Sequence, residues 1–170
     1  MTKGTLRTVV GDVTKPQRTD ENEMVVIPHV CNDLGIMGSG VAYALRKKWE
    51  QVYTDYVSRI DYLTKKTTTP ILGHVVMSDC EDNIIVANMI AQSGIVGINN
   101  SKPIKYVALV KCMVEVKWQV EMMQSLSNVV IHAPEFGGLR AGGNFDFILE
   151  LINEIWIENG ISCVIYKFEE

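Results

Sequence analysis

The segment Met24–Ala42 passes from an apolar, strand-like run through a glycine-rich loop into a helical pattern. His29 and Asn32 close the strand-like part, and three glycines fall within the next loop, 35–40. Glycine lets the backbone approach a ligand closely and adopt a positive φ. A helix that starts directly after such a loop presents free N–H groups and the positive end of its dipole. The segment therefore predicts a site for a phosphorylated ligand, with His29 and Asn32 beside it.

This glycine loop matches neither of the two common phosphate-binding fingerprints. It is not a G-x-x-x-x-G-K-[ST] loop, and it is not a clean G-x-G-x-x-G dinucleotide motif. An ordinary strand-to-helix turn that needs glycine only for its geometry would look much the same. The segment by itself leaves both interpretations open.

Along the whole chain, strand-like and helical patterns alternate, which indicates an α/β fold. The sheet is expected to be mixed and mostly parallel, with helices on both faces in three layers, and residues 1–170 form a single domain. Two of the strands are joined by a hairpin turn at 79–83. We expect strands at Thr5–Val10, Met24–Val30, Gly73–Ser78, Ile84–Ala91, Val129–Pro134 and Ile161–Phe168, and helices at Val41–Arg59, Ile104–Leu126 and Phe145–Glu158.

The loops that follow four of these strands are expected to meet at one edge of the sheet. In such sheets ligands sit beyond the carboxyl ends of the strands. The loops after Val10, Val30, Ala91 and Pro134 carry most of the glycines and polar residues. Two of them, the first glycine loop (35–40) and the second glycine loop (137–143), could hold a diphosphate from two sides. A plain strand-to-helix connection is the alternative for the second loop.

Charge and cysteine spacing narrow the class of protein. The formal net charge of −4 argues against a nucleic-acid binder, which would normally be basic, but backbone N–H groups can still bind a phosphate. No apolar run approaches the length of a membrane span, and the N-terminal residues lack the apolar core of a signal peptide. The four cysteines form no C-x-x-C pair, and no metal-ligand spacing is visible. We expect a cytoplasmic protein (host cytoplasm if viral) that acts without metal or cofactor.

Four segments together resemble the macro domain family of ADP-ribose-binding α/β domains. The resemblance covers essentially the whole chain and is closest to the ADP-ribose-1''-phosphate phosphatase branch, including its homologues in large tailed phages. The segments are V-V-G-D-V-T (9–14), H-V-C-N-D-L-G-I-M-G-S-G-V-A (29–42), A-N-M-I-A-Q-S-G (87–94) and A-P-E-F-G-G-L-R-A-G-G-N-F-D-F-I (133–148).

The resemblance implies a role for each loop. Asp12, with Val13 beside it, matches the family's Asp that accepts a hydrogen bond from the adenine amino group; an ordinary turn cap is the alternative. The first glycine loop would wrap the distal ribose and the diphosphate, and the second would cover the phosphates. Asn32 would lie near the distal ribose hydroxyls. The further ligand-binding positions implied are Gly38, Ser39, Gly40, Val41, Gln92, Gly137, Gly138, Leu139, Arg140, Ala141, Gly142 and Gly143.

In the phosphatase branch a catalytic His falls at the position of His29. Only His titrates near neutral pH when unperturbed, so His29 could act as acid or base, or instead as a nucleophile. Asn32 would orient the ribose or the attacking water. Arg140 could pair with the terminal phosphate, or it could be a solvated loop charge. His74 and His132 lie inside strand patterns and are interpreted as structural.

Three functions stay open at this point. The first is hydrolysis of ADP-ribose-1''-phosphate to ADP-ribose and phosphate. The second is removal of ADP-ribose from modified macromolecules, although the related branch uses a Lys after the central strand and an Asp in the second glycine loop, and this chain has neither. The third is a non-catalytic reader, which would follow if His29 packs as a core residue. The expected partners are ADP-ribose or its 1''-phosphate, with an ADP-ribosylated protein as a further candidate, and neither a membrane nor stable nucleic-acid binding is expected.

Overall fold

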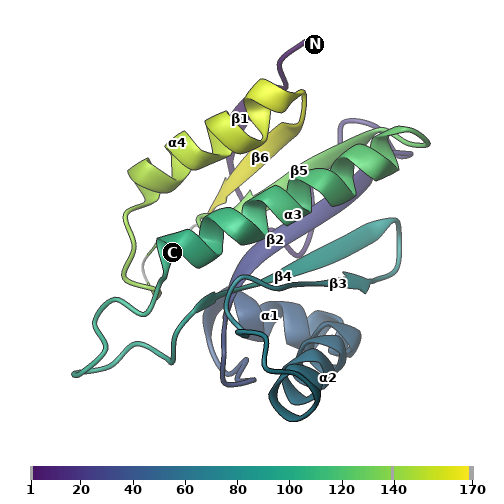
Figure 1. The fold of residues 1–170 in the computed structure, drawn as a ribbon. Helices are drawn as coiled ribbons and strands as arrows, with labels where there is room; N and C mark the ends of the chain where they lie inside the picture. The colour runs from purple at the N-terminus through teal and green to yellow at the C-terminus, as the bar shows by residue number, and fades with distance from the viewer. Residues whose placement is uncertain (1, 139, 169–170) are drawn as a thin grey trace.

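The computed structural model describes residues 2–138 and 140–168, which form one six-stranded sheet with helices on both faces (Figure 1). The strand order is β1-β6-β5-β2-β4-β3. The strands are β1 (Leu6–Val10), β2 (Met24–Asn32), β3 (Val75–Asp79), β4 (Ile84–Gln92), β5 (Val129–Pro134) and β6 (Ser162–Lys167). The helices are α1 (Gly40–Lys48), α2 (Glu50–Lys66), α3 (Tyr106–Gln124), α4 (Phe145–Ile155) and the short 3-10 helix η1 (Ile157–Asn159).

All strand pairings are parallel except the one between β3 and β4. The carboxyl ends of β1, β2, β4 and β5 therefore point to the same edge of the sheet, as the sequence predicted. β3 runs antiparallel at the far side of the sheet, beyond β4. The expected mixed, mostly parallel α/β sheet is confirmed.

The helices divide between the two faces of the sheet because strand residues alternate between those faces. Val26 of β2 packs with α3 and α4, whereas its neighbours Val25 and Ile27 pack with α1 and α2. Figure 1 shows α3 and α4 on one side of the sheet and α1 and α2 on the other. Loop 11–23 contributes Val13 to the hydrophobic core between the sheet and the helices α1 and α2. In the part of the chain that the structure describes, no helix has the length and apolar character needed to cross a bilayer.

The single helix expected at Val41–Arg59 is instead two helices, α1 and α2. Trp49 separates them, with extended backbone angles (φ −133°, ψ 92°), and the second helix continues to Lys66, beyond the expected end at Arg59. The Trp49 side chain is buried and its indole N–H donates to Oε1 of Glu81 at 3.4 Å. The apolar periodicity continues across the break, so the sequence pattern could not reveal it.

Other boundaries differ by a few residues. β2 and β4 extend to Asn32 and Gln92, because the polar residues at their ends still pair with each other. α3 begins at Tyr106 rather than Ile104, since Ile104 forms a bridge with Gln92. The helix expected at 145–158 ends at 155 and passes into η1.

Candidate functional site

The carboxyl edge of the sheet carries four loops, and hydrogen bonds tie three of them together. The N–H of Gly94 donates to Oδ1 of Asp33 at 2.9 Å, which joins the loop after β4 to the loop after β2. The N–H of Ile104 donates to the carbonyl of Ala141 at 3.0 Å, which joins the loop after β4 to the second glycine loop. The four loops span residues 11–23, 33–39, 93–105 and 135–144.

Asn32 shapes the start of the first loop through its own side chain. Its Oδ1 accepts the N–H groups of Leu34 at 2.9 Å and Ile36 at 3.2 Å, and its Nδ2 donates to the Ile36 carbonyl at 2.8 Å. The Tyr56 hydroxyl lies 2.8 Å from the same Oδ1 and 2.5 Å from the Asn32 carbonyl oxygen, and its single proton is shared between the two. Asn32 is 6% exposed, so its amide is committed to building the loop.

The N-terminus of α1 is open to a ligand, whereas that of α4 is closed. Ser39, the N-cap of α1, makes no side-chain capping bond, and the first turn holds no acidic residue. Asn144, the N-cap of α4, accepts the N–H groups of Asp146 and Phe147. Uncapped helix N–H groups and the helix dipole together favour an anion. Of these two helices, only α1 offers that site.

The second glycine loop approaches the start of α1. A Cβ placed on Gly40 would lie 3.0 Å from Cδ and Nε of Arg140, so the arginine side chain passes directly over the beginning of the helix. Gly40 itself has φ +60°. An exposed guanidinium beside uncapped N–H groups can bind phosphate oxygens with two parallel hydrogen bonds. The two glycine loops therefore meet at one corner that is suited to an anion, the anion-binding corner.

Glycine is needed in the second loop for close packing. A Cβ on Gly142 would lie 2.3 Å from the Ser101 carbonyl oxygen and 2.8 Å from Cα of Lys102, and φ at Gly142 is +73°. A Cβ on Gly143 would lie 2.2 Å from the carbonyl oxygen of Gly137, the same oxygen that accepts the N–H of Gly143 at 3.0 Å. These backbone contacts leave no room for any other residue.

Asp12 follows β1 at the same edge. Its Oδ1 accepts the N–H of Thr14 at 2.9 Å and the Thr14 hydroxyl at 2.7 Å, so it caps the turn as one alternative expected. The residue is exposed. Its second carboxylate oxygen makes no hydrogen bond among the described residues, and it can accept an amino group from a ligand.

His29 lies inside the protein rather than at the edge of the site. It is 2% exposed, and its Nε2 lies 2.6 Å from Oδ1 of Asn88 in β4. Asn88 in turn donates to the Val76 carbonyl and to the Ser78 hydroxyl. Burial lowers the pKa of His29 to about 4, so the ring is neutral at pH 7 and donates from Nε2. This is the geometry of a core histidine whose hydrogen bonds are satisfied.

His132 is also buried, and it anchors the loop that carries Asp12. Its Nε2 lies 2.8 Å from Oε2 of Glu23, and its Nδ1 lies 2.7 Å from the Tyr166 hydroxyl, which accepts the N–H of Gln17 at 2.7 Å. Burial lowers the pKa of His132, against the opposing effect of the Glu23 carboxylate. A neutral ring satisfies every bond, because Nε2 donates to Glu23 and Nδ1 accepts from Tyr166.

Comparisons with known proteins give a clear answer only at the level of structure. No family model matches the sequence, and no curated protein matches it. A protein of unknown function from Bacteroides thetaiotaomicron shares 30% identity, with a TM-score of 0.81 over 96% of this chain and 98% of that one. A macrodomain protein from Streptomyces coelicolor shares 28% identity, with a TM-score of 0.77 over 95% of this chain and 98% of that one.

The chain has the macrodomain fold. A structure of Thermosipho africanus DarTG in complex with ADP-ribose also matches in fold, with 14% identity and a TM-score of 0.69 over 97% of this chain and 42% of that one. The fold expected from the four sequence segments is thereby confirmed.

In this macrodomain fold, most positions expected to contact a ligand lie on the carboxyl-edge loops. The side chains of Val13 and Ala141 are buried, so only their backbone atoms can reach a ligand. Gln92 uses its Nε2 to hold the Gly94 carbonyl at 3.0 Å. Leu139 lies outside the described residues. As ligand contacts, these positions stay predictions. The positions at the edge are Asp12, Gln92, Gly38, Ser39, Gly40, Val41, Gly137, Gly138, Arg140, Gly142 and Gly143.

Two residues that shape the candidate site were not identified from the sequence. The helical pattern places Tyr56 on an apolar face, yet its hydroxyl accepts the N–H of Gly35 at 3.0 Å and holds Asn32. Asp33 joins two loops through Gly94. A polar tip on an otherwise apolar helix face was the available signal for Tyr56, whereas Asp33 gave none.

Protonation of His29 is expected to destabilise the protein in acid. The ordinary pKa of 6.5 applies to the unfolded chain, and the folded pKa is about 4. The unfolded state therefore binds the proton first, and stability present above pH 6.5 is lost as the pH falls toward 4, by up to about 3 kcal/mol. Urea unfolding of wild type and His29→Phe across this range measures the effect. Equal pH slopes for the two proteins would contradict it.

Proposed function

We propose that this chain binds ADP-ribose at the carboxyl edge of its sheet. The observation that carries the proposal is the corner where Arg140 passes over the uncapped start of α1. Backbone N–H groups, a helix dipole and a guanidinium all favour a diphosphate at that point. The chain has a net charge of −4, so its surface as a whole does not attract anions. The preference for an anion therefore comes from the groups at this corner.

The other loops suit the two ends of such a ligand. Asp12 is exposed and has a carboxylate oxygen that can accept the exocyclic amino group of adenine. The loop built by Asn32, 33–39, leads directly into the start of α1 at the corner, where it could contact a distal ribose. The ADP-ribose complex of Thermosipho africanus DarTG, which shares this fold, supports the proposal.

Hydrolysis of ADP-ribose-1''-phosphate is the second candidate function. As an alternative occupant of the anion-binding corner, the terminal phosphate would meet the same donors, which could stabilise its charge while water attacks phosphorus and ADP-ribose leaves. His29 is too deeply buried to reach such a phosphate, and its low pKa keeps the ring neutral near pH 7, so it cannot act there as a general acid. We therefore assign no acid, base or nucleophile role to His29. Asn32 keeps a positioning role through the loop that it builds.

Calorimetry with ADP-ribose tests the first proposal, and phosphate release from ADP-ribose-1''-phosphate tests the second. Binding with phosphate release in both wild type and His29→Phe would support a phosphatase that does not use His29. Binding without release would leave a reader module, or a hydrolase for another ADP-ribose linkage. No binding at all would reject the proposed function while leaving the fold unaffected.

Arg140→Ala is expected to weaken ADP-ribose binding by about tenfold, because a charge-assisted pair with phosphate contributes about 1.5 kcal/mol or more. Lys47→Ala is the matched control. Lys47 is an exposed cation in the last turn of α1, at the end of the helix away from its open start. The affinity of both variants is measured by calorimetry at one fixed ionic strength. Equal losses in both variants would show a general charge effect and not a contact at the corner.

A further inference from the structure

The edge strand β3 presents unpaired backbone groups along one side of the molecule. Within residues 2–138 and 140–168, β3 pairs with β4 alone. The N–H of Cys80 donates to the carbonyl of Ile84, so in the antiparallel alternation the backbone groups of Val75, Met77 and Asp79 point away from β4. Exposed edges usually carry Lys, Pro or a bulge that prevents pairing. β3, with the sequence VVMSD, is short and carries one charged side chain, Asp79, but it has neither Lys nor Pro, and its register with β4 is regular.

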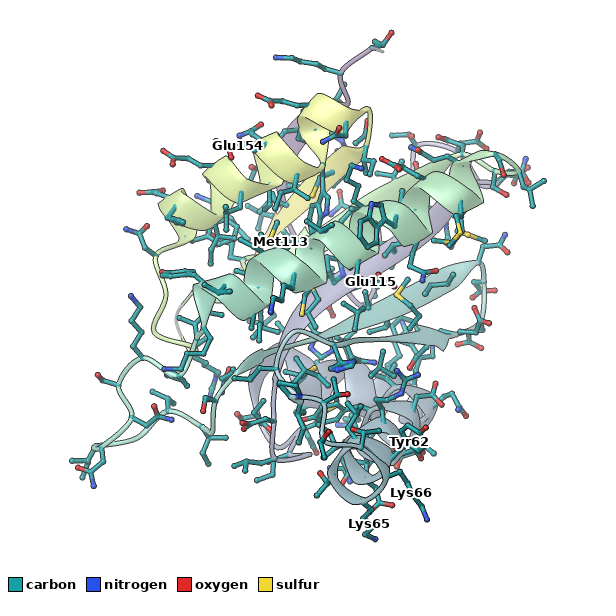
Figure 2. The ribbon with its side chains drawn as sticks, viewed as in Figure 1. Tyr62, Lys65, Lys66, Met113, Glu115 and Glu154 are labelled. Carbon is teal, nitrogen blue, oxygen red and sulfur yellow. The ribbon has the colours of Figure 1, made fainter. Side chains whose placement is uncertain are left out.

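A groove runs beside this edge, between β3 and α2. It has a volume of about 600 Å³, and its α2 wall is the stripe Gln51, Asp55, Ser58, Arg59 and Tyr62. A second hollow of about 290 Å³ continues past Arg59 to the start of β3. Figure 2 labels Tyr62 on α2 and Glu115 on α3, with β3 between the two helices in this view.

The two ends of the edge carry opposite charge. Asp55 and Asp79 lie at the end near Cys80, where both carboxylates, together with burial as the larger cause, raise the pKa of the thiol to about 11. Arg59 and Lys111 line the hollow at the other end, together with His74 and a single carboxylate from α3, that of Glu115. Among the described residues, none of Asp55, Asp79, Arg59 and Lys111 forms an ion pair.

A two-fold rotation brings the acidic end of the β3 edge in one copy against the basic end of the same edge in a second copy. If a second copy pairs antiparallel about Met77, its Asp79 comes opposite Val75 and its acidic end lies against the basic end of the first copy. On the flanking helices, Asp55 of each copy comes near Arg59 of the other. A two-fold interface must use the same patch on both subunits, and only a patch with opposite ends satisfies itself in this way.

We propose that this chain forms a two-fold symmetric dimer in which the β3 edges of two copies pair antiparallel, joining the two sheets into one. The free backbone groups of Val75, Met77 and Asp79 then find partners. The charged ends meet in two equivalent pairs. This edge lies on the outer side of β4, and the dimer needs no ligand at the carboxyl-edge loops.

Sedimentation velocity of the whole chain over a series of concentrations tests the dimer. We expect a reversible shift toward twice the monomer mass. Asp79→Lys brings like charges together at both ends of the interface and is expected to weaken dimerisation by at least about tenfold. The double variant Asp79→Lys with Lys111→Glu exchanges the two charges that face each other at the ends of β3 and keeps the contacts between Asp55 and Arg59, so it is expected to recover most of the loss.

Two further variants make the result specific to β3. Met77→Pro removes an outward N–H donor at an edge position where proline is tolerated, and it is expected to abolish the dimer while circular dichroism shows the fold retained. Glu154→Lys is the matched control, with the same charge change on an exposed position of α4, and it should leave dimerisation unchanged. A monomer at every concentration would overturn the proposal. A dimer that survives both Asp79→Lys and Met77→Pro would overturn it as well.

Discussion

Gly142→Ala is expected to reduce ADP-ribose affinity by at least about a hundredfold, equivalent to about 3 kcal/mol. The added Cβ would lie 2.3 Å from the Ser101 carbonyl oxygen, and Gly142 has φ +73°, a conformation that alanine rarely adopts. Both obstacles are backbone and cannot be relieved by a side-chain rotation. The second glycine loop must therefore move away from residues 101–102, and Arg140 moves with it, away from the start of α1. Calorimetry with ADP-ribose measures the loss.

Gly97→Ala is the control for this variant. Gly97 lies in the loop after β4 at the same edge, and a Cβ there would meet no atom within 4 Å among the described residues. Its affinity is expected to stay within about twofold of wild type, since a surface substitution in open space costs little. If Gly142→Ala bound ADP-ribose as tightly as Gly97→Ala, the second glycine loop would not be part of the site.

His132→Leu is expected to lower the free energy of unfolding by about 3–5 kcal/mol, because it removes the hydrogen-bond partner of Oε2 in the buried Glu23 carboxylate and leaves the Thr19 hydroxyl, which donates to Oε1 at 3.2 Å. Glu23 is 1% exposed and His132 is fully buried, so water cannot replace the lost hydrogen bond. Tyr166 loses the acceptor of its hydroxyl at the same time, and this loosens its hold on Gln17 in the loop that carries Asp12. Urea unfolding at pH 7 measures the change in stability.

The double variant Glu23→Met with His132→Leu separates a buried charge from a simple loss of contacts. Removing both partners leaves no unpaired charge, so the double variant is expected to be more stable than His132→Leu alone. The coupling energy from the complete cycle, with Glu23→Met as the second single variant, should exceed about 1 kcal/mol. Additive losses would show that the pair is not energetically linked and that His132 contributes only packing.

Most strands, helices and loops of this fold were predicted from the sequence, because each depends on a pattern of residues that are close together in the chain. Apolar runs marked the strands, and clusters of glycine and polar residues marked the loops after β1, β2, β4 and β5. The rule that parallel strands share a carboxyl edge then brought those loops together, as observed. The helix break at Trp49 was missed because apolar residues continue with helical spacing on both sides of it.

The direction in which single side chains point, and the groups that surround them, could not be predicted from the sequence. Position 29 alternates with its neighbours, but only pairing with β4 places Asn88 within 2.6 Å of the His29 ring and seals it from water. Likewise Asn32 could have faced a ligand, and it was Tyr56, on a distant helix, that fixed its amide within the loop. Contacts between residues far apart in the chain set burial and hydrogen-bond partners, and these in turn set the pKa.

The sequence by itself therefore determined the fold class, the order of elements and which loops carry the candidate site. Tertiary structure alone decided the strand order, the open start of α1 beneath Arg140 and the placement of His29 in the core. It also decided that β3 lies at an edge with acidic and basic ends. The physical reason is that periodicity and turn chemistry act over a few neighbouring residues, whereas exposure and charge environment depend on segments that only folding brings together.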